Sequence, residues 1–441
     1  MYLRALFHVL ALSPALASQD AKLPASSATK LRTLLAEALE KPGKKSLSAL
    51  ESEGKRLEKK YRFEDLLAAL ARGPRRKSGL PKPRKLGRRK KEKFERFGSA
   101  LTGLGFEVDG HRYQYAVDLP PGFKNKKAVP LLVDPGHGGG ARLDQKGKAG
   151  YLDYFRRMAR AAGGKDWLVV RTEIIEQIGT GGVHKELPED EVCLVFDAFF
   201  RDIASRFHVD LDRIYVAGLS QTGFWSWYLG RARADRLAGI VPMGSVTWQV
   251  DRYLENFRNL PVHVLHGDQD PKCPVRQPRA TTARMKELGF PVEYQEIQGG
   301  KHDYSVWQHL GPALQSLARA PRARYPKKLS KKLQTEATPW CYWIRADKLK
   351  RKGPGKATAP PTASLAAEIQ GQTIDIETEG IAALTLCLSS KMLDLDEPVV
   401  VRRNGRVVHK KRVRRDFART LRVAVDKCDW LATYEAFVRV K

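Results

Sequence analysis

Three residues whose types together perform nucleophilic catalysis each follow a short apolar run of the sequence. Ser220 comes after the β-branched run at 214–217, Asp270 lies just beyond the apolar run at 261–265, and His302 follows the run at 292–297. A serine hydroxyl is a weak nucleophile until a neighbouring histidine accepts its proton, and a carboxylate is needed to orient that histidine. The types and their order therefore predict acyl transfer by Ser220, His302 and Asp270. Asp268 is the competing carboxylate, with a turn-stabilising role as its alternative.

The segment around Ser220 predicts a strand, a sharp turn and a helix. A turn of this kind is strained for residues that carry a Cβ, and Gly218 supplies the small residue that the turn needs. The helix N-terminus beyond the turn offers free N–H groups to a developing negative charge. Thr222 occupies the position two after the serine, where a glycine is usual, and Gly223 follows it. The alternative interpretation is a serine that only caps a helix after a strand.

A second feature is the glycine cluster that follows the buried strand at 129–133, in the segment Asp134-Pro-Gly-His-Gly-Gly-Gly140. Together with the Ser220 turn, it resembles the α/β-hydrolase superfamily, whose lipases and esterases carry an H-G-G-G segment. The resemblance implies an oxyanion hole formed by backbone N–H groups of Gly138 or Gly139 and of Gln221. A glycine-rich turn that merely connects strand to helix is the alternative.

Over residues of about 105–320 the chain is most similar to secreted carbohydrate esterases, polyester depolymerases and the catalytic domain of prolyl-oligopeptidase-like peptidases. No propeller precedes this region, which favours a small-ester hydrolase, with a serine peptidase as the second interpretation. We expect His137, Trp248 and Tyr304 to contact substrate, and the aromatic residues at 224–228 to belong to the core. Such a mechanism requires no metal and no organic cofactor.

The elements that must position these residues alternate between apolar strands and amphipathic helices from 105 to 328. This alternation predicts an α/β fold with a doubly wound, mostly parallel sheet, on which ligands bind beyond the carboxyl ends of the strands. From 329 to 441, short alternating runs and the turn at Asn404-Gly405 predict an antiparallel, β-sandwich-like domain. Its aromatic residues Trp340, Tyr342 and Trp343 either bind carbohydrate or close the interface with the catalytic domain.

The first 104 residues divide into three parts. Residues 1–17 have a basic start, an apolar run and the small-residue end Ala15-Leu16-Ala17, which predicts a secretory signal peptide and an exported protein, periplasmic or secreted. Residues 18–73 predict a helical segment, and residues 74–104 a basic, proline-punctuated linker. No later stretch is apolar for long enough to predict a transmembrane segment.

The net charge of +30 arises from 79 Lys and Arg against 49 Asp and Glu. A field of this sign favours acidic partners such as an anionic polysaccharide or another acidic polymer, while the alternative is that much of the charge lies in solvated segments. Because no aromatic residues interleave the basic run, we expect no specific nucleic-acid site. A vestigial hydrolase that acts as a polyanion-binding surface protein therefore stands beside the enzyme hypothesis. The five cysteines show no C-x-x-C pair.

Overall fold

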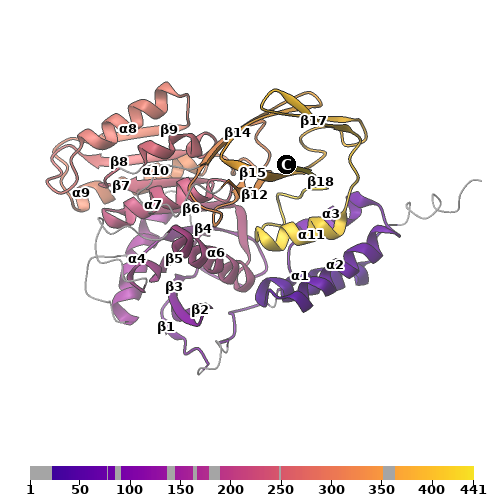
Figure 1. Cartoon of the computed structure of the whole chain (residues 1–441). Helices are drawn as coiled ribbons and strands as arrows, with labels where there is room; N and C mark the ends of the chain where they lie inside the picture. Colours follow the sequence, from indigo (N-terminus) through magenta and orange to yellow (C-terminus); the bar gives the residue numbers. More distant parts are fainter. Residues whose placement is uncertain are drawn as a thin grey trace, which may run out of the picture. The chain divides into compact units, whose positions relative to one another are not determined.

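The computed structural model describes residues 22–76, 78–84, 91–136, 145–161, 166–177, 189–247, 250–350 and 363–441 (Figure 1). The predicted signal peptide lies outside these residues. The chain forms two compact units, one made by the residues up to Arg75 with Asp416–Thr433, and the other by Arg76–Arg415 with Tyr434–Lys441. None of the helices in the described ranges is long and apolar enough to cross a membrane.

A nine-stranded sheet forms the centre of the larger unit. Its spatial order is β1-β2-β3-β5-β4-β6-β7-β8-β9. The pairs from β1 to β5 are antiparallel, and those from β5 through β4 and β6 to β9 are parallel, as predicted for a mostly parallel sheet. The strands are β1 Glu95–Phe97, β2 Ala100–Val108, β3 His111–Asp118, β4 Val129–Asp134, β5 Leu168–Thr172, β6 Val209–Leu219, β7 Gly239–Met243, β8 Val262–Gly267 and β9 Val292–Ile297.

Both faces of this sheet are covered, which is why its strands appear in the sequence as nearly continuous apolar runs. On one face Tyr215 and Ala217 of β6 belong to a core with Leu152 and Leu314 from the helices. On the other face Tyr115 packs edge-on against Phe199 at 5.4 Å between ring centroids. The helices of this part are α4 Gln145–Ala161, α5 Ile174–Gln177, α6 Glu189–Arg206, α7 Gln221–Arg233, η1 Asp251–Phe257, α8 Arg276–Glu287, α9 Tyr304–Trp307 and α10 Leu310–Leu317.

The order of the strands reverses at β4. From β4 the chain continues to β5 on one side, whereas β6, the strand after β5, lies on the other side of β4. In open α/β sheets the crevice beyond the carboxyl ends of strands at such a reversal is the usual ligand site. Ser220 follows β6, and the segment that begins at Pro135 follows β4. The topology therefore brings the predicted nucleophile and the start of the glycine cluster to the same crevice.

A buried ion network holds part of the predicted basic linker against this sheet. Glu92 accepts two hydrogen bonds of 2.9 Å from the Arg206 guanidinium, and both side chains are fully buried. Arg206 also donates to Asp202 at 2.8 Å, and Arg84 donates to the same Asp202 at 2.9 Å. The described linker residues on either side of 85–90 are therefore anchored by charge pairs, because a buried carboxylate needs such partners.

Two smaller sheets follow in the same unit. A five-stranded sheet has the order β10-β13-β14-β16-β17, and a four-stranded sheet has the order β11-β12-β15-β18. All their pairs are antiparallel except β14 with β16. The strands are β10 Lys328–Leu333, β11 Trp340–Cys341, β12 Ile344–Leu349, β13 Ala363–Gln370, β14 Thr373–Glu379, β15 Ile381–Leu388, β16 Val399–Arg403, β17 Arg406–Lys411 and β18 Ala436–Val440. Positive φ at Asn404 and Gly405 closes the predicted hairpin.

Two of the three aromatic residues singled out in this region are buried. The Trp343 indole donates to the Pro326 carbonyl at 2.8 Å, and the Tyr342 hydroxyl reaches the carbonyl of Ala234, at the end of α7, at 3.4 Å. Trp340 is half-buried, and the Arg345 guanidinium lies 5.7 Å from its ring centroid. The contact with α7 joins the C-terminal sheets to the helix that begins after Ser220.

The smaller unit is helical. It contains α1 Ala25–Glu40, α2 Lys44–Glu58, α3 Phe63–Ala71 and α11 Phe417–Asp426. Phe417 packs edge-on against Phe63 at 5.6 Å, and Arg422 pairs with Glu51 at 3.3 Å. The sequence analysis predicted the N-terminal helices but not α11, because its apolar residues lie in a region of strand-like runs.

Candidate active site

Ser220 stands at a strained turn between β6 and α7. Its φ of 61° and ψ of −120° are values that residues with a Cβ rarely adopt. Its N–H donates to the Met243 carbonyl at 2.9 Å, which fixes the turn to the carboxyl end of the neighbouring strand β7. The side chain is half-buried and so remains partly open to solvent. This is the geometry expected of a nucleophile that projects from the end of a sheet.

Two glycines make the turn sterically feasible. A Cβ on Gly218 would stand 2.2 Å from the Thr222 hydroxyl, and a Cβ on Gly223 would stand 2.7 Å from the Met243 carbonyl. Thr222 itself donates to the Leu219 carbonyl at 2.9 Å, so its side chain folds back over the strand end. The unusual threonine is therefore accommodated because position 218 is glycine, and Gly223 provides the second close approach.

The first backbone N–H groups of α7 have no hydrogen-bond partner within the helix, as at every helix N-terminus. Gln221 opens this helix and is buried, with 5% of its surface exposed. Its side-chain Nε2 is buried without a hydrogen-bond partner. Gln221 therefore supplies both a backbone N–H and an unpaired side-chain donor beside Ser220.

Asp270 is held in one orientation by the loop that follows β8. Its Oδ1 accepts hydrogen bonds from the N–H groups of Lys272 and Cys273, both at 2.8 Å. Its Oδ2 accepts from Nδ1 of His302 at 2.7 Å. An ionised carboxylate with these partners leaves Nε2 of His302 as the basic nitrogen. Asp270 rather than Asp268 thus contacts the predicted histidine.

Gly244 connects this pair to the serine turn. It directly follows Met243, the acceptor of the Ser220 N–H, and a Cβ placed on it would lie 3.2 Å from Oδ2 of Asp270 and 3.6 Å from Nδ1 of His302. Ser220, Asp270 and His302 therefore follow the carboxyl ends of β6, β8 and β9, and the Asp270–His302 pair lies against Gly244 at the end of β7. No hydrogen bond between the described Ser220 and His302 side chains is formed in this structure. Such contacts often tighten only when substrate binds.

The two loops that carry Asp270 and His302 are packed directly on one another. A Cβ on Gly267 would meet the Gly300 carbonyl at 2.3 Å, and the Gln269 N–H donates to that carbonyl at 3.0 Å. The glycines before His302 therefore permit close approach of two backbones.

Behind this pair lies a buried histidine that the sequence analysis did not single out. Nε2 of His266 donates to the Cys273 carbonyl at 2.8 Å and lies 3.8 Å from Oδ2 of Asp270, while its Nδ1 has no partner. Burial lowers the pKa of His266, against the opposing effects of the Cys273 carbonyl and the Asp270 charge. The hydrogen bond from His266 to the Cys273 carbonyl braces the loop 267–274. The H-G-x-x-D spacing was the available signal.

The strand end before the glycine cluster is also fixed by charge. Asp134 accepts from Arg171 at 3.1 Å and from the Gly136 N–H at 3.1 Å, and both charged side chains are buried. Gly136 has a φ of 101°, and a Cβ there would stand 2.5 Å from the Thr172 carbonyl. The segment beyond, with His137, Gly138 and Gly139, lies outside the described residues, as does Trp248. Tyr304 is 57% exposed at the start of α9.

A mostly parallel sheet bears, at neighbouring strand ends, a sharp serine turn, an aspartate and a histidine in the chain order that the resemblance predicts. The chain has the α/β-hydrolase fold. This confirms the fold class predicted from the sequence.

Comparison with known proteins gives partial matches. No protein-family model matches the chain. A curated relative, acyl-protein thioesterase 1 of Neurospora crassa, is 27% identical over 124 residues, a match that covers 26% of this chain and 51% of that protein. The chain thus spans about half the length of the curated relative that it matches.

Solved structures that align with part of this chain include three hydrolases. A thermostable esterase aligns with a TM-score of 0.41 and 20% identity over 51% of this chain and 64% of its own. A ferulic acid esterase aligns with a TM-score of 0.40 and 19% identity over 50% of this chain and 96% of its own. A putative dipeptidyl aminopeptidase IV from Bacteroides ovatus aligns with a TM-score of 0.40 and 15% identity over 50% and 35%.

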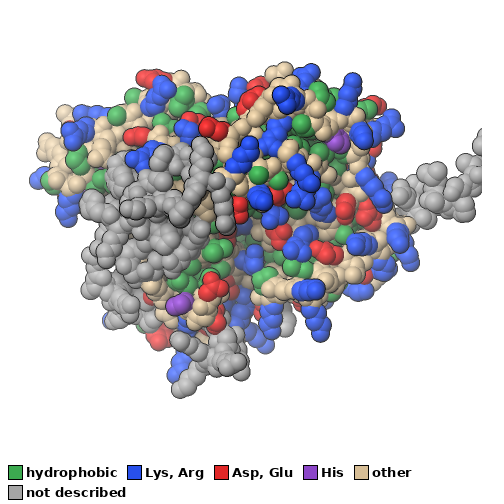
Figure 2. Space-filling view, viewed as in Figure 1, with side chains coloured by type: hydrophobic (Ala, Val, Ile, Leu, Met, Phe, Trp, Pro, Cys, Tyr) green, Lys and Arg blue, Asp and Glu red, His purple; other side chains and the backbone are tan. Residues whose placement is uncertain are grey.

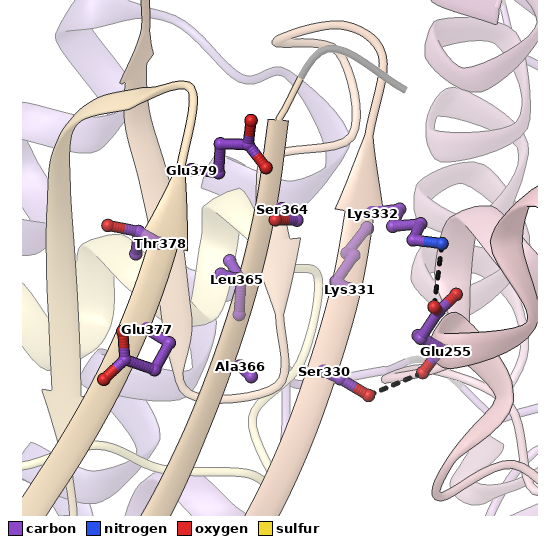
Figure 3. Close-up of a pocket in the computed structure, with 10 residues that line it drawn as sticks. All are labelled: Glu255, Ser330, Lys331, Lys332, Ser364, Leu365, Ala366, Glu377, Thr378 and Glu379. Atoms are coloured by element: carbon purple, nitrogen blue, oxygen red, sulfur yellow. Dashed lines mark hydrogen bonds and ion pairs between the residues drawn. The ribbon is translucent and has the colours of Figure 1, made fainter. Parts of the chain in front are cut away.

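A groove of about 370 Å³ is lined by none of the predicted site residues that the structure describes (Figure 3). It runs over β10, β13 and β14 beside Glu255 of η1. Glu255 pairs with Lys332 at 2.7 Å, and the Ser330 hydroxyl donates to its backbone carbonyl at 2.8 Å. The small side chains Ser364 and Ala366 lie between this pair and the carboxylates of the next strand, as Figure 3 shows.

Proposed function

We propose that this protein is an exported serine hydrolase that cleaves carboxylic esters through an acyl-enzyme on Ser220. The observation that carries the proposal is the 2.7 Å hydrogen bond between His302 and Asp270 at the strand ends next to the strained Ser220 turn. A histidine that is oriented by a buried carboxylate and lies beside an accessible serine fits the requirements of nucleophilic acyl transfer.

In this mechanism Oγ of Ser220 attacks the ester carbonyl while Nε2 of His302 accepts the hydroxyl proton. Asp270 keeps the proton of the neutral imidazole on Nδ1 and stabilises the imidazolium that forms. The N–H of Gln221, with N–H groups from the Gly138 and Gly139 segment, would stabilise the oxyanion, each at about 3 kcal/mol in the transition state. His302 then protonates the departing alcohol, and a water activated by His302 releases the acid.

For the substrate we propose carbohydrate-linked or polymer esters, as the family resemblance implies. The similarity to an acyl-protein thioesterase makes thioesters a second class of acyl substrate that the same chemistry would cleave. A prolyl-oligopeptidase-like peptidase remains the alternative activity, and amide substrates distinguish it.

The test is hydrolysis of p-nitrophenyl acetate and p-nitrophenyl butyrate by the purified protein beside Ser220→Ala. We expect turnover in the native protein and loss of nearly all of it in the variant. Feruloyl and acetyl sugar esters, an S-acyl peptide and a prolyl p-nitroanilide then rank the substrate classes. A variant as active as the native protein would overturn the proposal, and selective cleavage of the anilide would favour the peptidase.

We propose further that an anionic polymer docks on the C-terminal hairpin of β16 and β17. Residues 399–415 contain no acidic side chain, and several cations there are exposed and form no ion pair among the described residues: Arg406, Lys410, Lys411 and Arg414. Figure 2 shows Lys and Arg side chains gathered over the part of the molecule where β17 lies in Figure 1. An edge strand with cations also discourages sheet-to-sheet aggregation, which is the competing explanation.

Retention on a polygalacturonate column tests this docking surface. The double variant Lys410→Glu/Lys411→Glu should elute at markedly lower salt than the native protein, because exposed charge pairs are screened by salt. The matched control is Lys126→Glu/Lys127→Glu, an exposed lysine pair before β4. Equal shifts by both variants would mean that net charge alone causes retention and would contradict a specific surface.

Export rests on the sequence of residues 1–17. We expect the protein to be recovered outside the cytoplasm with Ser18 as its first residue. N-terminal sequencing of the recovered protein checks the cleavage site, and a cytoplasmic protein that retains Met1 to Ala17 would contradict it.

A further inference from the structure

Cys273 brings a third kind of metal-binding atom to the Asp270 and His302 pair. One ligand atom from each of Asp270, Cys273 and His302 lies within 4.8 Å of those of the other two. This is the only such group of three His, Cys, Asp or Glu side chains in the part of the chain that the structure describes. Carboxylate, imidazole and thiolate are the three ligand types from which zinc sites are built.

The distances suit a tetrahedral ion after small movements. Zinc binds sulfur at about 2.3 Å and nitrogen or oxygen at about 2.0–2.2 Å, so neighbouring donors in a tetrahedron stand roughly 3.3–3.6 Å apart. Oδ2 of Asp270 and Nδ1 of His302 are 2.7 Å apart and would move slightly away from one another. The Cys273 sulfur lies within 4.8 Å of a ligand atom of each of these residues and would move toward the ion. The Asp270 side chain is fully buried, and 9% of the His302 side-chain surface is exposed.

We propose that Asp270, Cys273 and His302 form an inhibitory site for a thiophilic divalent cation such as Zn²⁺. The sulfur binds as thiolate and releases its proton to solvent. His302 binds through Nδ1, and the imidazole proton then resides on Nε2. Asp270 turns Oδ2 from the imidazole to the ion and keeps the Lys272 and Cys273 N–H bonds on Oδ1.

If Ser220 and His302 act as in the proposed function, a cation bound to Nδ1 of His302 blocks catalysis. Nε2 of His302 must be free of a proton to accept that of Ser220. With the ion on Nδ1, the neutral imidazole carries its proton on Nε2 and cannot act as the base. Asp270 no longer orients the ring. The bound cation therefore switches off ester hydrolysis without touching Ser220, and removal of the ion restores it.

The first experiment reads metal binding without using activity. The purified full-length protein is titrated with Co²⁺, whose thiolate complexes show a near-ultraviolet charge-transfer band and whose tetrahedral sites absorb strongly in the visible. We expect both features in the native protein, no charge-transfer band in Cys273→Ser and an unchanged spectrum in Cys428→Ser, a buried thiol of the smaller unit. The absence of the band in the native protein would overturn the site whether or not the protein is an esterase.

The second experiment measures inhibition. Zn²⁺ should inhibit p-nitrophenyl acetate hydrolysis, and EDTA should restore the rate. For Cys273→Ser and Cys273→Ala, the rate at each Zn²⁺ concentration is compared with the same variant's metal-free rate. The Zn²⁺ concentration that halves this rate should be at least ~10–100-fold higher than for the native protein, because loss of even a supporting contact weakens a metal site by that factor. Equal inhibition of the native protein and both variants would contradict the proposal. A protein without esterase activity would count against the proposed function, and the cobalt spectrum would still decide the site.

Discussion

Gly218 and Thr222 fit against one another across the turn that carries Ser220, with no room between them for a methyl group. A Cβ on Gly218 would lie 2.2 Å from the Thr222 hydroxyl, 2.5 Å from its Cβ and 2.6 Å from its carbonyl carbon. The last contact is with backbone, so rotation of the threonine side chain cannot relieve it. The turn thus depends on glycine at this position.

Gly218→Ala should therefore destabilise the protein by about 3 kcal/mol, at the upper end of the range for overpacking a buried site. Chemical denaturation measures the change. Gly150→Ala is the matched control, because Gly150 lies within α4 with nothing within 4 Å of a Cβ built on it. We expect that control to be stabilised by up to about 1 kcal/mol, as for Gly to Ala in a helix. Equal stabilities of the two variants would contradict the steric account of the turn.

The identity of the carboxylate gives a second prediction. Asp270→Asn should lower kcat for p-nitrophenyl acetate by about 10⁴-fold, the loss known when an amide replaces the orienting carboxylate of a triad. Asp268→Asn should lower it less than about threefold, because no hydrogen bond joins the described Asp268 and His302 side chains. A larger loss in Asp268→Asn than in Asp270→Asn would reverse the assignment.

His266 is predicted to act as a positioning residue. Because its bond to the Cys273 carbonyl braces the loop that holds Asp270, His266→Ala should lower kcat roughly 10-fold with little change in KM, as expected when an outer partner is lost. His263→Ala is the control from the same strand β8, where the imidazole is also buried and its Nδ1 lies 3.2 Å from a Glu293 carboxylate oxygen. Similar kcat losses in the two variants, or a loss explained by unfolding in circular dichroism, would contradict this role.

A partly buried ion pair away from the site predicts a pH dependence of stability. Asp197 accepts two hydrogen bonds from Arg233, at 2.9 and 2.6 Å. Burial by itself would raise the pKa of Asp197, but the charges of Arg233 and Arg236 and the Arg233 hydrogen bond outweigh it and lower the pKa. A lowered pKa means that the carboxylate stabilises the fold above the unfolded-state pKa, and that this contribution is lost as pH falls through the folded-state pKa.

Asp197→Asn should therefore destabilise the protein by roughly 2 kcal/mol at pH 7. Breaking a fully buried ion pair costs about 3–5 kcal/mol, and the loss here is smaller because Asp197 is partly exposed. The difference between native protein and variant should shrink only below the ordinary aspartate pKa of about 3.9. Urea titrations at pH 7, 5, 4 and 3.5 measure it. A difference that stays constant across this series would show that the charge of Asp197 does not contribute.

The sequence predicted the central sheet well because its strands are buried on both faces. Runs such as 129–133 and 214–217 are continuously apolar, and each ends at a residue that breaks the pattern. The order of Ser220, Asp270 and His302 also sufficed to place them at strand ends. The contact between His302 and Asp270 follows from this placement, since parallel strands end at the same edge of a sheet.

Other features depend on contacts between distant parts of the chain. The helix α11 is amphipathic, but it packs on the first helices of the chain, hundreds of residues away in sequence. Glu92 lies in a basic stretch that composition marks as a linker, yet Arg206 from α6 holds it. Cys273 and His266 meet Asp270 only through the fold of one loop. Their sequence signal is the short segment 266–274, which does not reveal which side chains face the carboxylate.

The most direct test of the central claim is to identify the residue that reacts with a fluorophosphonate. The folded native protein is incubated with the reagent and digested, and the modified peptide is sequenced by mass spectrometry. An activated serine predicts a single adduct on Ser220, abolished by Ser220→Ala and by prior denaturation, and strongly slowed in His302→Ala. No adduct on the folded protein, or an adduct on another residue, would contradict the assignment of Ser220 as the nucleophile.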